Sequence, residues 1–137
     1  MDVPDPERLS RFLFFKRWFS AEKQRVRPDA FIPHPWIELS VSCTEGLKDK
    51  EIWALGQKTA EARSDNPPLL GRADLKAHHA RNQGLRVDRN DDPPFHANIL
   101  GWSTEGRAIQ RMKAIELAAN STLRLMPDPE PDKSSQA

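Results

Sequence analysis

The segment His96–Trp102, with the sequence HANILGW, is the stretch on which the expected fold depends. A loop with two prolines precedes it, and a glycine and two hydroxyl residues mark the transition to the next segment. Prolines and glycines of this kind bound a strand, while serine or threonine commonly caps a helix. We therefore predict a central strand over residues 96–101 that leads into a packed helix over residues 104–122.

The helix predicted over residues 104–122 has apolar side chains at helical spacing and basic side chains opposite them. The apolar positions expected to face the core are Ala108, Met112, Ile115 and Ala119, and the basic positions are Arg107, Arg111 and Lys113. An amphipathic helix of this length is expected to cover one face of a sheet.

Two further elements have clear periodicity. In residues 37–43 the apolar side chains Ile37, Leu39, Val41 and Cys43 alternate with polar ones. This period of two predicts a strand with one face in the core and the other face either exposed to solvent or forming part of a site. Residues 48–63 begin with acidic side chains and then repeat apolar ones every three or four positions, which predicts an amphipathic helix.

Other stretches leave alternatives open. Residues 69–74 favour a strand, although Asp74 is also a possible cap for a short helix over residues 75–83. Residues 11–19 fit either a strand or a helix, and their aromatic density favours the strand. Residues 5–10 suggest a first helical turn, and residues 123–125 an edge strand.

Together these elements predict an α+β fold in one small domain, residues 1–126. We expect three to five short strands packed against two main helices. Residues 127–137 are polar and rich in proline, which predicts a disordered C-terminal tail. The 137 residues, of which 37% are hydrophobic, suit a single modest core.

The formal net charge is +1, so no global field draws the chain to nucleic acid or to an anionic membrane. The single cysteine, Cys43, predicts no intramolecular disulfide and favours a cytoplasmic location. No apolar run approaches the roughly 18 residues of a membrane span, and the N-terminus lacks the pattern of a signal peptide.

No sequence motif of a familiar enzyme class or paired-cysteine metal site is present, and no metal or cofactor is predicted. The best candidates for acid–base chemistry are His96, Asp74 and His79, with His78 beside the last. They come together only if the 69–83 unit packs beside the strand of His96. A structural role for His96, at the start of a central strand, is favoured over a catalytic one.

Candidate binding residues are more scattered. Asn98 shares a strand face with His96, and Trp36 is a possible partner anchor. Arg17 and Lys23 belong to a basic run interleaved with aromatic residues, a composition typical of single-strand nucleic-acid surfaces. The same rings are also the richest core material in the chain, and we favour that role for them.

Several short motifs carry a resemblance to a known group of proteins. They are Phe31-x-Pro33, Leu39-Ser40-Val41, Gly84-Leu85-x-Val87, His96-Ala97-x-Ile99-x-Gly101-Trp102 and Glu116-Leu117-Ala118. Over residues 11–125 the chain resembles a diffuse group of small uncharacterised bacterial proteins with no established activity. The resemblance implies a bacterial, cytoplasmic protein and draws attention to His96.

The sequence thus favours a non-catalytic binding or accessory module that acts through contacts with a protein partner. Nucleic acid is a less favoured partner, and the oligomeric state is not indicated. The alternative is a small enzyme, or a toxin-like protein that processes nucleic acid, using His96 with Asp74 or His79.

Overall fold

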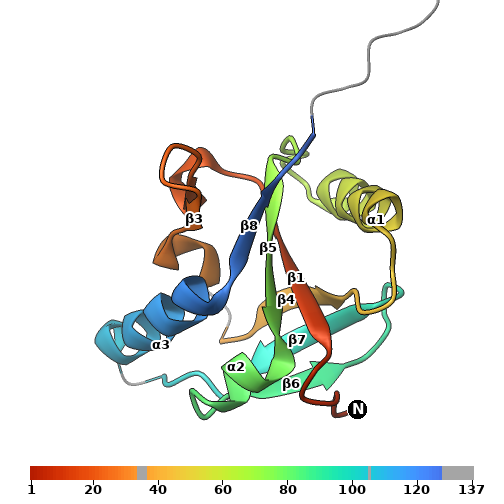
Figure 1. Ribbon diagram of the computed structural model, residues 1–137. Helices are drawn as coiled ribbons and strands as arrows, with labels where there is room; N and C mark the ends of the chain where they lie inside the picture. The colour runs from red at the N-terminus through yellow and green to blue at the C-terminus, as the bar shows by residue number, and fades with distance from the viewer. Residues whose placement is uncertain (34–36, 105, 128–137) are drawn as a thin grey trace, which may run out of the picture.

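The computed structural model describes residues 1–33, 37–104 and 106–127, which form a small α+β domain (Figure 1). The elements, in chain order, are β1 (Arg8–Leu13), the 3-10 helix η1 (Lys16–Trp18), β2 (Phe19–Ser20), β3 (Arg25–Val26), the 3-10 helix η2 (Pro28–Phe31), β4 (Leu39–Cys43), α1 (Asp49–Ala62), β5 (Gly71–Lys76), α2 (Ala77–Arg81), β6 (Arg86–Arg89), β7 (His96–Leu100), α3 (Arg107–Asn120) and β8 (Thr122–Leu125).

The main sheet has six strands in the order β6-β7-β4-β1-β5-β8, and each neighbouring pair is antiparallel. The strands β2 and β3 form a separate hairpin. The predicted α+β class is confirmed, but the prediction of three to five strands is wrong because the count is higher. The central position of the 96–101 strand is also corrected, since β7 is the second strand from one edge.

The two neighbours of β1 pair with it to different extents. β5 pairs along the whole strand, from Arg8↔Lys76 to Leu13↔Gly71. β4 pairs only at Leu9↔Cys43 and Ser10↔Ser42. Strands β1 and β4 therefore diverge after Ser10, and this divergence positions the cleft described below.

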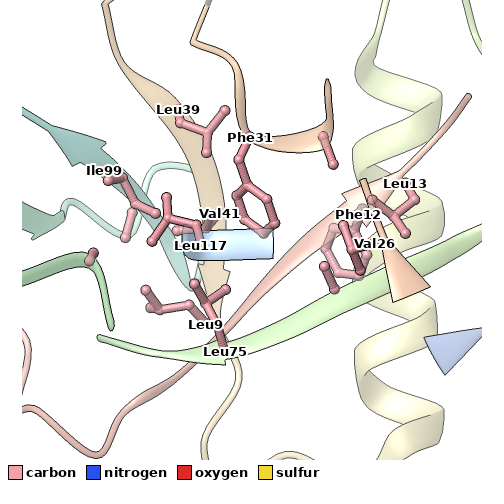
Figure 2. Close-up of a cluster of buried hydrophobic side chains, with 14 of the residues drawn as sticks. Leu9, Phe12, Leu13, Val26, Phe31, Leu39, Val41, Leu75, Ile99 and Leu117 are labelled. Carbon is pink, nitrogen blue, oxygen red and sulfur yellow. The ribbon is translucent and has the colours of Figure 1, made fainter. Parts of the chain in front are cut away.

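One face of the sheet carries the main hydrophobic core, which η2 and α3 cover. Leu9, Val41 and Ile99 lie on this face and belong to the same core cluster as Phe31 and Leu117 (Figure 2). Side chains alternate across a strand, so the apolar positions of β4 share the core face, while Ser42 on the other face is also buried. This prediction is confirmed for Leu39, Val41 and Cys43, whereas Ile37 precedes the strand and is 51% exposed.

The other face of the sheet packs against α1, which lies on the opposite side from α3 (Figure 1). The Glu51 carboxylate accepts a hydrogen bond from the Lys48 amide and so satisfies a donor at the start of α1. Gly56 brings the helix close to the sheet, because a Cβ there would lie 2.7 Å from the Phe12 ring. The predicted helix over residues 48–63 is confirmed.

The predicted buried stripe of the last helix is wrong. α3 begins at Arg107 and buries Ala114, Leu117 and Ala118. The residues expected to face the core, namely Ala108, Met112, Ile115 and Ala119, are all exposed. This helix has two apolar faces, and the one with the smaller side chains packs against the domain.

Three local predictions also change. The expected helical turn at residues 5–10 is wrong, because a turn there leads directly into β1. The aromatic run over residues 11–19 is a strand only as far as Leu13, after which η1 and β2 follow. Asp74 is not a helix cap, since it lies in the middle of β5 and the short helix α2 begins three residues later. The edge strand expected near residues 123–125 is confirmed as β8.

None of the helices in the described part of the chain is both long enough and apolar enough to cross a membrane. The tail predicted over residues 127–137 lies outside the described residues, apart from Pro127.

Candidate functional site

A cleft of about 450 Å³ lies between α1 and the polar face of the sheet. Its size is within the range of about 300 to 1,000 Å³ that is typical of ligand sites. Its walls come from β1, β4, α1 and the loop before β7. We call it the α1 cleft, and its lining residues are Arg11, Phe12, Phe14, Ser40, Val41, Ser42, Leu55, Lys58, Thr59, Ala62, Arg63, Pro93, Pro94, Phe95 and His96.

The α1 cleft combines an apolar surface with positive charge. Phe12 and Phe14 are buried aromatic residues of the lining, and Phe95 contributes another ring from the loop. Its cationic residues are Arg11, Lys58 and Arg63. Among the described residues that line the cleft there is no aspartate or glutamate. A surface of this kind suits a ligand with an apolar body and a negative group.

Arg11 occupies the space where β1 and β4 diverge. Its Nε donates a hydrogen bond to the Ala30 carbonyl and its Nη1 donates one to the Ser40 carbonyl, both at 3.0 Å. The guanidinium also lies 5.0 Å from the centre of the Trp18 ring. Burial, and secondarily Arg63, lowers the pKa of Arg11 to about 10, so it remains cationic at neutral pH. None of these contacts supplies a negative charge.

The other two cations come from α1 and its C-terminal end. Arg63 stacks over Phe14, with 5.1 Å between the guanidinium carbon and the ring centre, and forms an exposed ion pair with Asp65. The hydrogen bond from Arg63 lowers the pKa of Asp65, which is therefore ionised at neutral pH. Lys58 lies one turn earlier and is exposed. The cations therefore converge from separate elements onto one cavity.

His96 lies at the wall of the α1 cleft and is held by two hydrogen-bonded side chains. Its Nδ1 is 2.8 Å from Asn90 Oδ1, and its Nε2 is 3.3 Å from the Ser40 hydroxyl. The same Asn90 atom also accepts a hydrogen bond from the backbone amide of Asp92, so it is the oxygen and not the nitrogen of the Asn90 side-chain amide. We therefore place the His96 proton on Nδ1, so that Nε2 accepts the hydroxyl proton of Ser40.

Burial lowers the pKa of His96 below its ordinary value of 6.5, although Glu38 and Asp92 raise it. His96 is therefore neutral at pH 7. Its main chain also holds the preceding loop, because its carbonyl accepts the amides of Asn90 and Asp91. These contacts hold the loop before β7 and the imidazole ring in place, and the structural role of His96 stays a prediction.

Phe95, at the rim of the cleft, has a left-handed backbone with φ of 73°. A bulky residue rarely adopts this conformation, which is a source of backbone strain that is often found at binding sites. Here the strained backbone accompanies a ring that faces the cleft, next to His96. Arg89 lies with its guanidinium carbon 5.8 Å from the centre of the same ring.

The histidine and aspartate predicted to work with His96 are elsewhere. Asp74 shares a row on the sheet face with His96, through Ser42 and Ser10, but three strand spacings of about 4.8 Å separate the ends of this row. Asp74 instead accepts hydrogen bonds from Ser10 and Arg72. The condition that the 69–83 unit pack beside the strand of His96 is therefore not met.

His79 belongs to α2, where its Nδ1 accepts the amide of Lys76 and its ring lies 4.2 Å from that of His78. Burial is the main factor that lowers the pKa of His79, followed by His78. It has a local structural role at the start of α2, and it is not among the residues of the α1 cleft.

The predicted binding residues do not form one site. Asn98 pairs in register with Ser40 and with Asp88, beside the cleft rather than in its lining. Arg17 is exposed and stacks over Phe15, while Lys23 is exposed in the turn between β2 and β3. Trp36 lies outside the described residues.

The aromatic rings near Arg17 and Lys23 offer little surface for stacking on bases. Phe12, Phe14 and Trp18 are buried, as expected if they belong to the core. Cys43 is likewise buried, and desolvation, its largest effect, raises the pKa of its thiol to about 11. A thiol of this kind is protonated at neutral pH and is a poor nucleophile.

Sequence reasoning missed most of the cleft. Lys58 and Arg63 were not predicted as site residues, and Arg11 was considered only as part of the basic run that contains Arg17 and Lys23, because nothing in the spacing of these residues indicates that β1 and α1 bring them together. Ser40 and Ser42 had a partial signal, since they belong to the strand face that was expected to be wet or lined by a site. His96 is the predicted site residue that does line the cleft.

The described ranges contain no cluster of three or more histidine, cysteine, aspartate or glutamate residues able to hold a metal ion. A second hollow, at the edge strand β6, includes Asp2, Arg81 and Asp88. Its Arg81 is already paired with Asp2 and Asp5, so its charge is balanced locally. The α1 cleft is therefore the better candidate site.

Comparison of the chain with protein-family models, curated proteins and solved structures finds no match. The resemblance to small bacterial proteins accordingly stays a prediction, and the α1 cleft is the basis for the functional proposal.

Proposed function

We propose that this chain is a non-catalytic binding module whose α1 cleft takes an acidic, apolar segment of a partner protein. The observation that carries the proposal is the positive charge of Arg11, which among the described residues contacts two carbonyl groups and an aromatic ring but no carboxylate. A partly buried cation without a carboxylate favours an anionic ligand, because the ligand supplies the missing charge.

The apolar part of the ligand would lie on the partly exposed side chains of Leu55 and Phe95, and its carboxylate near Arg11, Lys58 and Arg63. Aromatic walls with a few charged groups are typical of sites that bind an apolar body in a fixed orientation. A cytoplasmic partner is part of the proposal, in keeping with the single buried cysteine.

Isothermal titration calorimetry of the full chain with an acetylated peptide containing the sequence Leu-Phe-Asp tests this proposal. We expect one site per chain and weaker binding as the salt concentration rises, because the charge contacts are partly exposed. The small carboxylate 4-phenylbutyrate distinguishes a peptide site from a site for a free carboxylic acid. Tighter binding of 4-phenylbutyrate than of the peptide would contradict the choice of a protein partner.

The variant Lys58→Glu is expected to weaken peptide binding by about tenfold, which corresponds to about 1.4 kcal/mol. Lys50→Glu is its matched control, because it makes the same charge change on an exposed residue of α1 that does not line the cleft. Equal losses in the two variants would indicate a general charge effect and would contradict the assigned site.

A second candidate function follows from the hydrogen-bonded series Ser40, His96 and Asn90. A hydroxyl next to a neutral imidazole, with a third group that orients the ring, is the arrangement of a nucleophile and its base. The candidate is a small hydrolase, in which His96 works with Ser40 rather than with Asp74 or His79.

A fluorophosphonate probe tests the hydrolase directly, since it labels serine residues activated by a base. The hydrolase predicts labelling of Ser40 that is lost in His96→Ala and unchanged in His79→Ala. If the wild-type chain does not react with the probe but binds the acidic peptide, the result would favour the binding module over the enzyme.

A further inference from the structure

The outward face of α3 is apolar along its whole length. Met112 is 66% exposed, Ile109 46% and Ile115 43%, and the exposed Ala108 and Ala119 lie at the two ends. Large apolar side chains that gather on one surface of a soluble domain mark an interaction surface. The opposite side of α3, with Ala114 and Leu117, already packs on the domain.

The exposed residues have the spacing of a coiled-coil seam. Ala108, Met112, Ile115 and Ala119 are separated by four, three and four positions, as are the apolar a and d positions of a heptad repeat. In this repeat Met112 and Ala119 take the a position, while Ala108 and Ile115 take the d position. The stripe therefore suits another helix that packs along α3.

The charges beside the seam indicate which helix this is. Arg111 takes the g position and Glu116 the following e position. In a parallel pair of helices, a g side chain lies next to the e side chain five residues further along the other helix. A second copy of this chain therefore places Arg111 beside Glu116 of the partner, and the two-fold axis generates the same pair again.

An antiparallel pair of the same helices lacks these contacts. There, g positions face g and e positions face e, so that Arg111 would lie near Ala118 and Glu116 near Ile109. Arg111 is available for a new partner, because its present contact with Asp29 is a 3.9 Å ion pair between two exposed groups. The charge pattern thus favours the parallel arrangement.

We propose that the chain forms a parallel homodimer through the outward face of α3. The helix α1, which borders the α1 cleft, lies on the other side of the sheet from α3 (Figure 1), so dimerisation leaves both clefts open. Only two heptads are present and the interface is small, so the dimer dissociates on dilution. The proposal does not depend on the ligand of the cleft.

Sedimentation equilibrium of the full chain over a range of concentrations tests the dimer. The expected result is an average mass that rises from that of the monomer towards that of the dimer. Met112→Glu should abolish this rise, whereas the control Ile37→Glu, at an exposed apolar residue outside α3, should leave it unchanged. A wild-type chain that stays monomeric, or a dimer unaffected by Met112→Glu, would overturn the proposal.

Charge reversal tests the parallel arrangement. Arg111→Glu and Glu116→Arg should each weaken the dimer when measured alone, because like charges then meet in both pairs. Mixing the two variants should restore association, since opposite charges meet again. Failure of the mixture to associate while the wild type dimerises would refute the proposed pairing. A second test is the variant Ala119→Cys, which should form a disulfide-linked dimer under mild oxidation. The absence of that dimer would also refute the parallel pairing.

Discussion

Arg72 is the most deeply buried charged side chain of the described domain, with an exposed fraction of 1%. Its guanidinium bonds to Asp49 at 2.8 Å and to Asp74 at 3.1 Å, and it stacks over Trp53 at 4.6 Å. These contacts join β5 to α1. Asp74, predicted as a possible catalytic partner of His96, therefore belongs to an ion-pair cluster that holds α1 on the sheet.

Replacing Arg72 with alanine is expected to destabilise the domain by about 3 kcal/mol, because the poorly exposed carboxylate of Asp74 loses its cation. Chemical denaturation in urea measures this loss. Arg124→Ala is the matched control, since Arg124 pairs with Arg72 across the sheet but is exposed, and its loss should change stability by less than about 0.5 kcal/mol. Equal effects of the two substitutions would contradict the structural role of the Arg72 cluster.

At the residue scale, the sequence indicated a functional side chain only where a residue with acid–base or ligand chemistry also stood at a recognisable position in the predicted fold. His96 was found because it begins a strand after a proline-rich loop. The importance of Arg11 could not be predicted, because it depends on the divergence of β1 from β4, a feature of tertiary structure that no local pattern encodes. The local sequence does not distinguish a solvated arginine among aromatic residues from a buried one.

At the scale of elements, the contact between α1 and the sheet depends on Gly56. A Cβ at this position would lie 2.7 Å from two atoms of the Phe12 ring and 2.9 Å from Leu69 Cδ2, and both side chains are buried. Gly56→Ala gains about 1 kcal/mol in helix propensity but overpacks the contact. Because both contacted side chains are buried, we expect the overpacking to cost about 3 kcal/mol, the upper end of its usual range, which leaves a net loss of about 2 kcal/mol.

The melting temperature of Gly56→Ala should therefore fall by several degrees. The same substitution at Gly106, where a Cβ meets no atom within 4 Å, should have a smaller effect. Phe12 also lines the α1 cleft, so Gly56→Ala should weaken binding of the acidic peptide as well. An unchanged melting temperature would show that α1 moves away from the sheet without cost.

Periodicity predicted the main elements but not how each one packs. The period of two identified β4 because one side of that strand is buried and the other faces the cleft. For α3 the same reasoning failed, since the helix has apolar side chains on two faces and period alone does not decide which face meets the sheet. The edge strand β6 was not predicted because its sequence, RVDR, has a single apolar residue and therefore no alternating pattern, unlike the TLRL of β8.

At the scale of the whole molecule, two partly buried histidines, one in β7 and one in α2, make stability depend on pH. Burial lowers the pKa of His96 and that of His79 in the folded chain. Unfolding returns both to the ordinary value of 6.5, so the unfolded chain binds more protons than the folded chain between the lowered pKa and 6.5. Their contribution to stability is fully present above this window and is lost as the pH falls through it.

The free energy of unfolding should therefore decrease between pH 8 and pH 5, as measured by urea denaturation. The carboxyl groups with lowered pKa values, Asp49, Asp65, Asp91 and Glu45, have ordinary values of 3.8 or 4.5 and lose their contributions mainly at lower pH. His96→Gln should flatten the pH dependence in part, and the double variant with His79→Gln should flatten it further. A double variant that retains the wild-type slope would show that other groups control it, and would contradict the assignment of neutral, buried imidazoles to these two positions.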